Sequence, residues 1–156
     1  MISLRITAML ALLGLAACAG TNGNGIGLPG NGFPGGNTFV QCNPGTQVQL
    51  ARPAPNQTGT GSINAIEIVA NGSNNILNQS PGSWQLQVTD NLGNQYLSGP
   101  LSTISDTGGP HPYSSDFFYN APIQSLPAGY TYNVSMIQAN AGCSAFPLSP
   151  YGTFST

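Results

Sequence analysis

The chain has 156 residues, which fits one modest domain plus a targeting segment, and only 4% of them are charged. Arg5 and Arg52 carry its only permanent positive charges, which excludes the row of phosphate contacts made by a nucleic-acid-binding protein. An apolar fraction of 40% with a net charge of −2 favours a packed core over disorder.

Residues 1–17 have the pattern of a signal peptide. One early positive charge, Arg5, precedes a mostly apolar stretch from Ile6 to Ala17. This stretch is shorter than the roughly 20 apolar residues that span a bilayer, and it has the length of a signal-peptide core. A buried helix of the fold is the alternative, which the Gly/Asn-rich segment directly after it disfavours. We therefore expect the protein to be exported.

The segment Leu15-Ala16-Ala17-Cys18 resembles the lipobox of bacterial lipoproteins. The resemblance implies that the leader is cut before Cys18, that the Cys18 thiol carries a diacylglyceryl group, and that the new amino group is acylated. Two or more acyl chains anchor a protein stably, since each buried CH₂ contributes about 0.8 kcal/mol. The absence of aspartate at position 19 implies the outer membrane, in a bacterium that has two membranes. Ordinary secretion with a free Cys18 thiol is the alternative.

Residues 18–37 are expected to form the lipidated cysteine and a flexible linker, since they are rich in Gly and Asn and show no apolar period. The chain has three cysteines, an odd number for an exported protein. If Cys18 carries lipid, Cys42 and Cys143 remain as a pair in an oxidising compartment. We therefore predict a Cys42–Cys143 disulfide that joins the two ends of the domain, with two buried free thiols as the alternative.

Residues 38–156 show short apolar runs of period two, separated by turn residues. Trp84, Leu86 and Val88, for example, alternate with polar residues, and the sequence DNLGN after them predicts a hairpin turn. Seven short strands of this kind favour a two-sheet antiparallel β-sandwich. The expected strands are Gln47–Leu50, Ile63–Ala70, Trp84–Thr89, Gln95–Leu101, Asp116–Asn120, Tyr130–Ile137 and Tyr151–Ser155.

The segment from Leu126 to Thr156 resembles the last third of a fibronectin type III domain. The matching residues are Leu126, Gly129, Tyr132 and Val134, followed by Ala139, Asn140, Gly142 and Ser144. Trp84 departs from that family, because it falls in the third strand, as in immunoglobulin domains. The cysteine pair departs from the usual immunoglobulin disulfide, so we predict the wider immunoglobulin-like class.

Tyr132 is expected to form a tyrosine corner within this segment. In such a corner the ring packs in the core and the hydroxyl bonds to backbone a few residues upstream, here near Leu126–Gly129. This role is structural.

We find no catalytic constellation, metal cluster or cofactor motif in the sequence, and we predict a protein that is not an enzyme. His111 is the only histidine, lies between two prolines, and is expected to be solvated. Asp90, Asp106 and Asp116 are dispersed, and a calcium site using Asp106 and Asp116 is a less favoured alternative. An enzyme would need a cleft that gathers His111 and at least one carboxylate.

Aromatic residues in two segments are the candidates for a binding surface. If Phe118 is buried in its strand, its neighbours Phe117 and Tyr119 face outward or pack beneath a loop. An edge strand covered by Asp106–Pro112 is the alternative interpretation. The candidate surface residues are Tyr113, Phe117, Tyr119, Phe146 and Tyr151.

These patterns together predict a membrane-anchored lipoprotein of the cell envelope. It would display one immunoglobulin-like module that binds a protein or a glycan, and no nucleic acid. A structural accessory of an envelope assembly, without a dedicated ligand, is the alternative, and an enzyme is less favoured.

Overall fold

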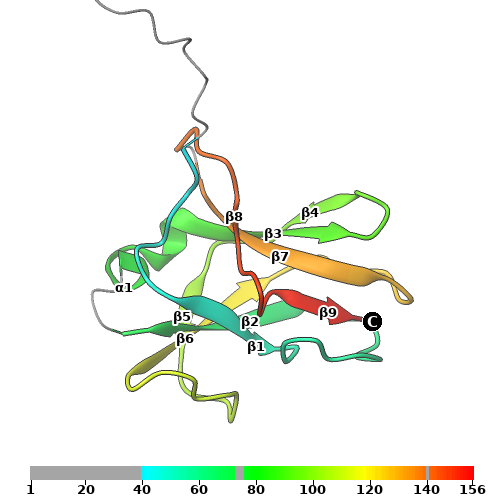
Figure 1. The fold of residues 1–156 in the computed structure, drawn as a ribbon, viewed down its shortest axis with the longest axis horizontal. Coiled ribbons are helices and arrows are strands. Elements are labelled where there is room, and N and C mark those ends of the chain that lie inside the picture. Colours follow the sequence, from blue (N-terminus) through cyan, green and yellow to red (C-terminus); the bar gives the residue numbers. More distant parts are fainter. Residues whose placement is uncertain (1–39, 73–75, 140) are drawn as a thin grey trace, which may run out of the picture. The chain divides into compact units, whose positions relative to one another are not determined.

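The computed structural model describes residues 40–72, 76–139 and 141–156, which belong to one compact unit, Asn37–Thr156 (Figure 1). The expected signal peptide (1–17) and the expected lipidated Cys18 with its linker (18–37) lie outside the described residues. Within the described part of the chain, no helix combines the length and the apolar character that crossing a membrane requires.

The domain consists of two antiparallel sheets, which confirms the predicted all-β sandwich (Figure 1). The first sheet has the order β1-β2-β6-β5, and its strands are β1 (Val48–Arg52), β2 (Ala65–Asn71), β6 (Asp116–Pro122) and β5 (Ser102–Ile104). The second has the order β4-β3-β7-β8, with β9 also paired to β7; its strands are β4 (Gln95–Leu97), β3 (Trp84–Asp90), β7 (Thr131–Gln138), β8 (Phe146–Pro147) and β9 (Thr153–Ser155). A short α1 (Ile76–Gln79) and a 3₁₀ turn (Pro81–Ser83) link β2 to β3. This is the A-B-E-D and C′-C-F-G arrangement of an immunoglobulin-like domain.

Two of the expected strands are shorter in the structure, and each lies next in the chain to a short strand that was not expected. The expected strand Gln95–Leu101 ends at Leu97 as β4, and the chain then crosses to the other sheet, where β5 pairs with β6. Backbone contact with β3 continues beyond β4 but is irregular, because the Ser98 N–H donates to the Leu86 carbonyl at 2.9 Å while the Leu86 N–H donates to the Ser98 Oγ at 2.8 Å instead of to a backbone carbonyl. Pro100 has no N–H, and the Leu101 N–H makes the last of these bonds, to the Trp84 carbonyl at 2.9 Å. The expected last strand, Tyr151–Ser155, begins only at Thr153 as β9, and a strand that was not expected, β8, precedes it across a segment that contains Pro150.

The main core lies between the sheets and follows the predicted period of two. From β3 it receives Trp84, Leu86 and Val88, and from the neighbouring β7 it receives Tyr132, Val134 and Met136. Trp84 is 2% exposed in the third of the expected strands, and its Nε1–H has no hydrogen-bond partner among the described residues. Each such large apolar side chain contributes about 1.5–3 kcal/mol when fully buried.

A second, smaller cluster covers the outer face of the first sheet and corrects the prediction for β6. Phe118 packs there with Ala51 and Val69 beneath the β5–β6 loop (residues 105–115), where Gly109 lies close against it. Phe117 and Tyr119 point the other way, towards the main core, and Tyr119 is fully buried. The prediction of an exposed binding surface is therefore wrong for Tyr119, while Phe117 is partly buried against the main core. The loop covers the outer face of β6, and the main core covers the inner face, so β6 has apolar side chains on both faces. The alternative of an edge strand does not hold, because β6 lies between β2 and β5.

Two constraints tie the ends of the domain together. A disulfide joins Cys42, before β1, to Cys143, after β7, with 5.2 Å between their Cα atoms, which confirms the predicted bridge. It closes a loop of 101 residues, and such bridges stabilise small domains by about 2–4 kcal/mol. The Tyr132 ring is buried, and its hydroxyl donates to the Pro127 carbonyl at 2.7 Å, inside the segment expected to accept it.

Candidate functional site

The structure gathers three of the five predicted aromatic residues around one groove. Tyr113, Phe146 and Tyr151 line it, whereas Phe117 and Tyr119 belong to the core. Tyr151 is 51% exposed, while Tyr113 and Phe146 are partly buried. We call this feature the aromatic groove; its volume is about 510 Å³, and it is lined by Thr46, Gln47, Val48, Gln49, Pro112, Tyr113, Phe146, Pro147, Leu148, Ser149, Pro150 and Tyr151.

The walls of the aromatic groove come from three separate parts of the chain. Residues 46–49, at the start of β1, form one wall, and residues 146–151, from β8 and the segment after it, form the other. The Leu50 N–H donates to the Tyr151 carbonyl at 3.1 Å, which holds these two walls side by side. Pro112 and Tyr113, from the β5–β6 loop, complete the lining. None of the lining side chains carries a charge, so the groove offers stacking surfaces, amides and hydroxyls but no ion-pair partner.

Gln49 is the functional candidate that the sequence did not indicate. Its side chain lines the aromatic groove and is only 8% exposed, yet its amide makes no hydrogen bond within the described part of the chain. Among the described residues, Trp84 Nε1 is the only fully buried side-chain polar atom without a partner, so the Gln49 amide still reaches the solvent in the groove, where it can bond to a polar ligand group. In β1 this residue lies opposite Val69, on the outer face of the sheet. A sequence pattern of period two assigns such a position to solvent, but here the β5–β6 loop and the β8–β9 segment form a groove over it.

Tyr113 connects the aromatic groove to the loop that carries it. Its ring packs against the cluster of Ala51, Val69 and Phe118, and its backbone N–H donates to Asp116 Oδ1 at 3.1 Å. Burial raises the pKa of the Tyr113 hydroxyl, and the charge of Asp116 and the nearby Tyr151 add to the increase. At neutral pH the hydroxyl therefore keeps its proton and can donate a hydrogen bond.

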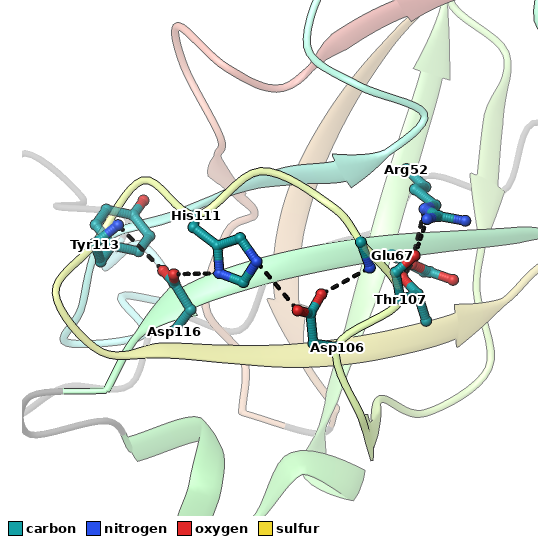
Figure 2. A network of polar contacts seen from close by, with 8 residues as sticks. Arg52, Glu67, Asp106, Thr107, His111, Tyr113 and Asp116 are labelled. Atoms are coloured by element: carbon teal, nitrogen blue, oxygen red, sulfur yellow. Dashed lines mark hydrogen bonds and ion pairs between the residues drawn. The ribbon is translucent and has the colours of Figure 1, made fainter.

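The His111 side chain is 57% exposed, in line with the solvated residue that the sequence suggested, but it also has two carboxylate partners. Figure 2 shows its imidazole between two carboxylates: Nδ1 lies 3.0 Å from Asp116 Oδ2, and Nε2 lies 3.1 Å from Asp106 Oδ2. Its ring also meets Phe118 edge to face, with 5.5 Å between ring centroids. Asp106 and Asp116 are therefore not dispersed, because the loop between them folds back on itself. Sequence separation alone could not show this.

The same network extends to the first sheet through Thr107. The Thr107 hydroxyl donates to Glu67 Oε2 at 2.6 Å, and the Arg52 guanidinium donates to the Thr107 carbonyl (Figure 2). Arg52 Nε lies 3.7 Å from Glu67 Oε2. Arg52, Glu67, Asp106, His111 and Asp116 thus form a single group that fastens the loop, and Asp90 is the only other Asp or Glu after position 67.

This arrangement determines what chemistry the cluster supports. It does gather His111 beside carboxylates, next to a hollow of about 510 Å³, as an enzyme would require. Both imidazole nitrogens, however, face carboxylate oxygens, so neither is free to accept a proton from a substrate. The two carboxylates lie at different ring nitrogens, and among the described residues no three His, Cys, Asp or Glu side chains are grouped to hold a metal ion. In this form the cluster fastens the loop.

Comparison with known proteins adds no relative: no family model, no curated protein and no solved structure matches this chain.

Proposed function

We propose that the protein is a membrane-anchored lipoprotein of the cell envelope whose immunoglobulin-like domain binds an uncharged glycan in the aromatic groove. The lipobox-like segment that ends at Cys18 supports the anchor. One observation carries the ligand class: the unpartnered Gln49 amide lies in a charge-free groove lined by aromatic rings.

A neutral sugar chain matches both properties of the aromatic groove. The apolar face of a sugar ring stacks on an aromatic side chain such as Tyr151, which is half exposed. Sugar hydroxyls both donate and accept hydrogen bonds, so they can satisfy the NH₂ and the carbonyl of the Gln49 amide together. A proline-rich peptide would also suit an aromatic groove, but its proline residues offer only carbonyl acceptors. A charged polymer would find no partner among the lining residues.

The binding test uses the purified full chain in detergent and a panel of cellohexaose, maltohexaose and chitohexaose, measured by titration calorimetry. We expect one of these neutral hexasaccharides to bind, and Tyr151→Ala to weaken binding by about tenfold or more. Gln49→Met keeps the side-chain length but removes the amide, and should also weaken binding. Leu97→Ala is the matched control, because Leu97 is 57% exposed on β4, in the other sheet.

Three results would contradict this ligand class. They are no binding of any hexasaccharide by the wild type, equal binding by Tyr151→Ala, or binding of an oligoproline peptide in place of the sugars. The anchor is tested separately by the mass of the mature protein. We expect a diacylglyceryl-modified chain that begins at Cys18; an unmodified chain with a free Cys18 thiol would overturn the anchor.

A further inference from the structure

The β5–β6 loop is held almost entirely by side chains. Within residues 106–113, each hydrogen bond found in the described part of the chain has a side chain as donor or acceptor. Gly108 N–H donates to Asp106 Oδ1 at 2.8 Å, and Tyr113 N–H donates to Asp116 Oδ1 at 3.1 Å. His111 connects those two carboxylates and so closes the loop between them. We call His111, Asp106 and Asp116 the His111 clamp.

The His111 clamp requires a particular number of protons. A carboxylate has no hydrogen to donate, so both contacts of the imidazole are hydrogen bonds only when both ring nitrogens carry hydrogen. In the neutral imidazole one nitrogen presents a lone pair to a carboxylate oxygen, and that contact becomes repulsive. Histidine is the side chain whose charge ordinarily changes between about pH 5 and 8, a range in which aspartates remain ionised.

We propose that the His111 clamp makes the aromatic groove sensitive to pH. With a doubly protonated imidazole the loop is closed, and Pro112 and Tyr113 are held as part of the groove lining. As the pH rises and the imidazole loses a proton, the clamp loses one contact and the loop loosens. A ligand must then order this wall as it binds, which lowers its affinity. The part of this proposal that concerns affinity rests on the proposed function.

Of the two contacts of the imidazole, we expect the one between His111 Nε2 and Asp106 to be lost first. The Asp106 side chain is 45% exposed, whereas that of Asp116 is 8% exposed and also accepts the Tyr113 N–H. The other charged groups nearby are Glu67 on β2 and Arg52 on β1, which hold Thr107, and the phenol of Tyr113. Glu67 and Arg52 are paired with each other, so the proton on the imidazole is the variable that decides the contact with Asp106.

The Asp106→Asn variant tests whether the loop closes only when both ring nitrogens of His111 carry hydrogen. The Asn carbonyl can still accept the Gly108 N–H, which leaves the NH₂ to face His111 Nε2. That NH₂ can donate to the lone pair of a neutral imidazole whose Nδ1–H still donates to Asp116. This variant should therefore keep the loop closed at high pH, where the wild type loosens. A carboxylate that served only for packing would not produce this difference.

The experiment follows amide hydrogen exchange of residues 106–113 in the full chain at about pH 5.5 and about pH 8, corrected for intrinsic exchange, with ¹⁵N NMR shifts of the imidazole reporting its protonation. We expect wild-type protection to fall by about tenfold between the two pH values, and Asp106→Asn to show no such fall, because its NH₂ pairs with the neutral imidazole and faces an N–H when both ring nitrogens are protonated. Equal wild-type protection at both pH values, or the same fall in Asp106→Asn, overturns the proposal.

Affinity is measured at the same two pH values for the hexasaccharides used above. A parallel loss of affinity in the wild type, absent from Asp106→Asn, supports regulation of the groove. A loosened loop with unchanged affinity overturns that regulation. If no hexasaccharide binds at either pH while protection behaves as expected, the proposed ligand class fails and the clamp stands.

Discussion

The β3–β4 turn and the β5–β6 loop are both held by carboxylates, but in opposite ways. In the turn, one buried residue, Asp90, accepts hydrogen bonds from Leu92 N–H at 2.9 Å, Asn94 N–H at 2.8 Å, Asn94 Nδ2 at 2.9 Å and the Tyr96 hydroxyl at 3.2 Å. All its donors lie within six residues. In the loop, the partners come from β1, β2, β6 and the loop itself, and one of them is a histidine. The turn is thus built from its own segment, whereas the loop depends on the finished fold and on a proton.

Replacement of Asp90 should have the largest effect on stability. Asp90→Ala removes the acceptor for two backbone N–H groups and for the partly buried Tyr96 hydroxyl at one time. Asp116→Ala, in the loop, loses two donors and should cost about 1–3 kcal/mol. Urea unfolding of the two variants should show the greater loss for Asp90→Ala. If Asp90→Ala lost less free energy of unfolding than Asp116→Ala, the turn would not depend on its carboxylate more strongly than the loop does.

The stability that Asp90 gives to the β3–β4 turn should depend on pH in a more acidic range than the closure of the β5–β6 loop. Burial alone would raise the pKa of Asp90, but hydrogen bonds from Asn94, Leu92 and Tyr96 outweigh it and hold the pKa below its ordinary value. A lowered pKa in the folded state means that this stabilisation is complete above the ordinary aspartate value of about 3.9 and is lost as the pH falls further. The free energy of unfolding, measured from about pH 5 to pH 2, should therefore decline less steeply in Asp90→Asn than in the wild type. Identical slopes would contradict this role for Asp90.

Replacement of His111 should have the smallest effect on global stability. The imidazole is 57% exposed and Asp106 is 45% exposed, and exposed ion pairs contribute about 0–1 kcal/mol. His111→Ala should therefore shift the urea midpoint little, while exchange protection of residues 106–113 falls at every pH. A large loss of global stability would mean that the clamp supports the core as well as the loop.

The contrast also explains which features the sequence could reveal. The DNLGN turn, the period of two in β3 and β7 and the tyrosine near Pro127 are local patterns, and the cysteine pair follows from counting. Phe117, Phe118 and Tyr119 stand in a row, and no local pattern says which parity faces the core when a loop covers the other face. The meeting of His111 with Asp106 depends on the path of the β5–β6 loop across the outer face of the first sheet. The burial of Gln49 depends on that loop and on the β8–β9 segment together, and neither path can be read from a local pattern.

The Cys42–Cys143 disulfide also determines how a mechanical load would enter the domain. Tension applied to the chain before Cys42 reaches a residue that is covalently joined to the turn after β7, in the second sheet, as well as to the backbone that leads to β1, in the first. The load therefore divides between the two sheets before it reaches β1. Without the bond, only the backbone hydrogen bonds of Val40 and Cys42 with Ser144, among the described residues, would share the load with β1.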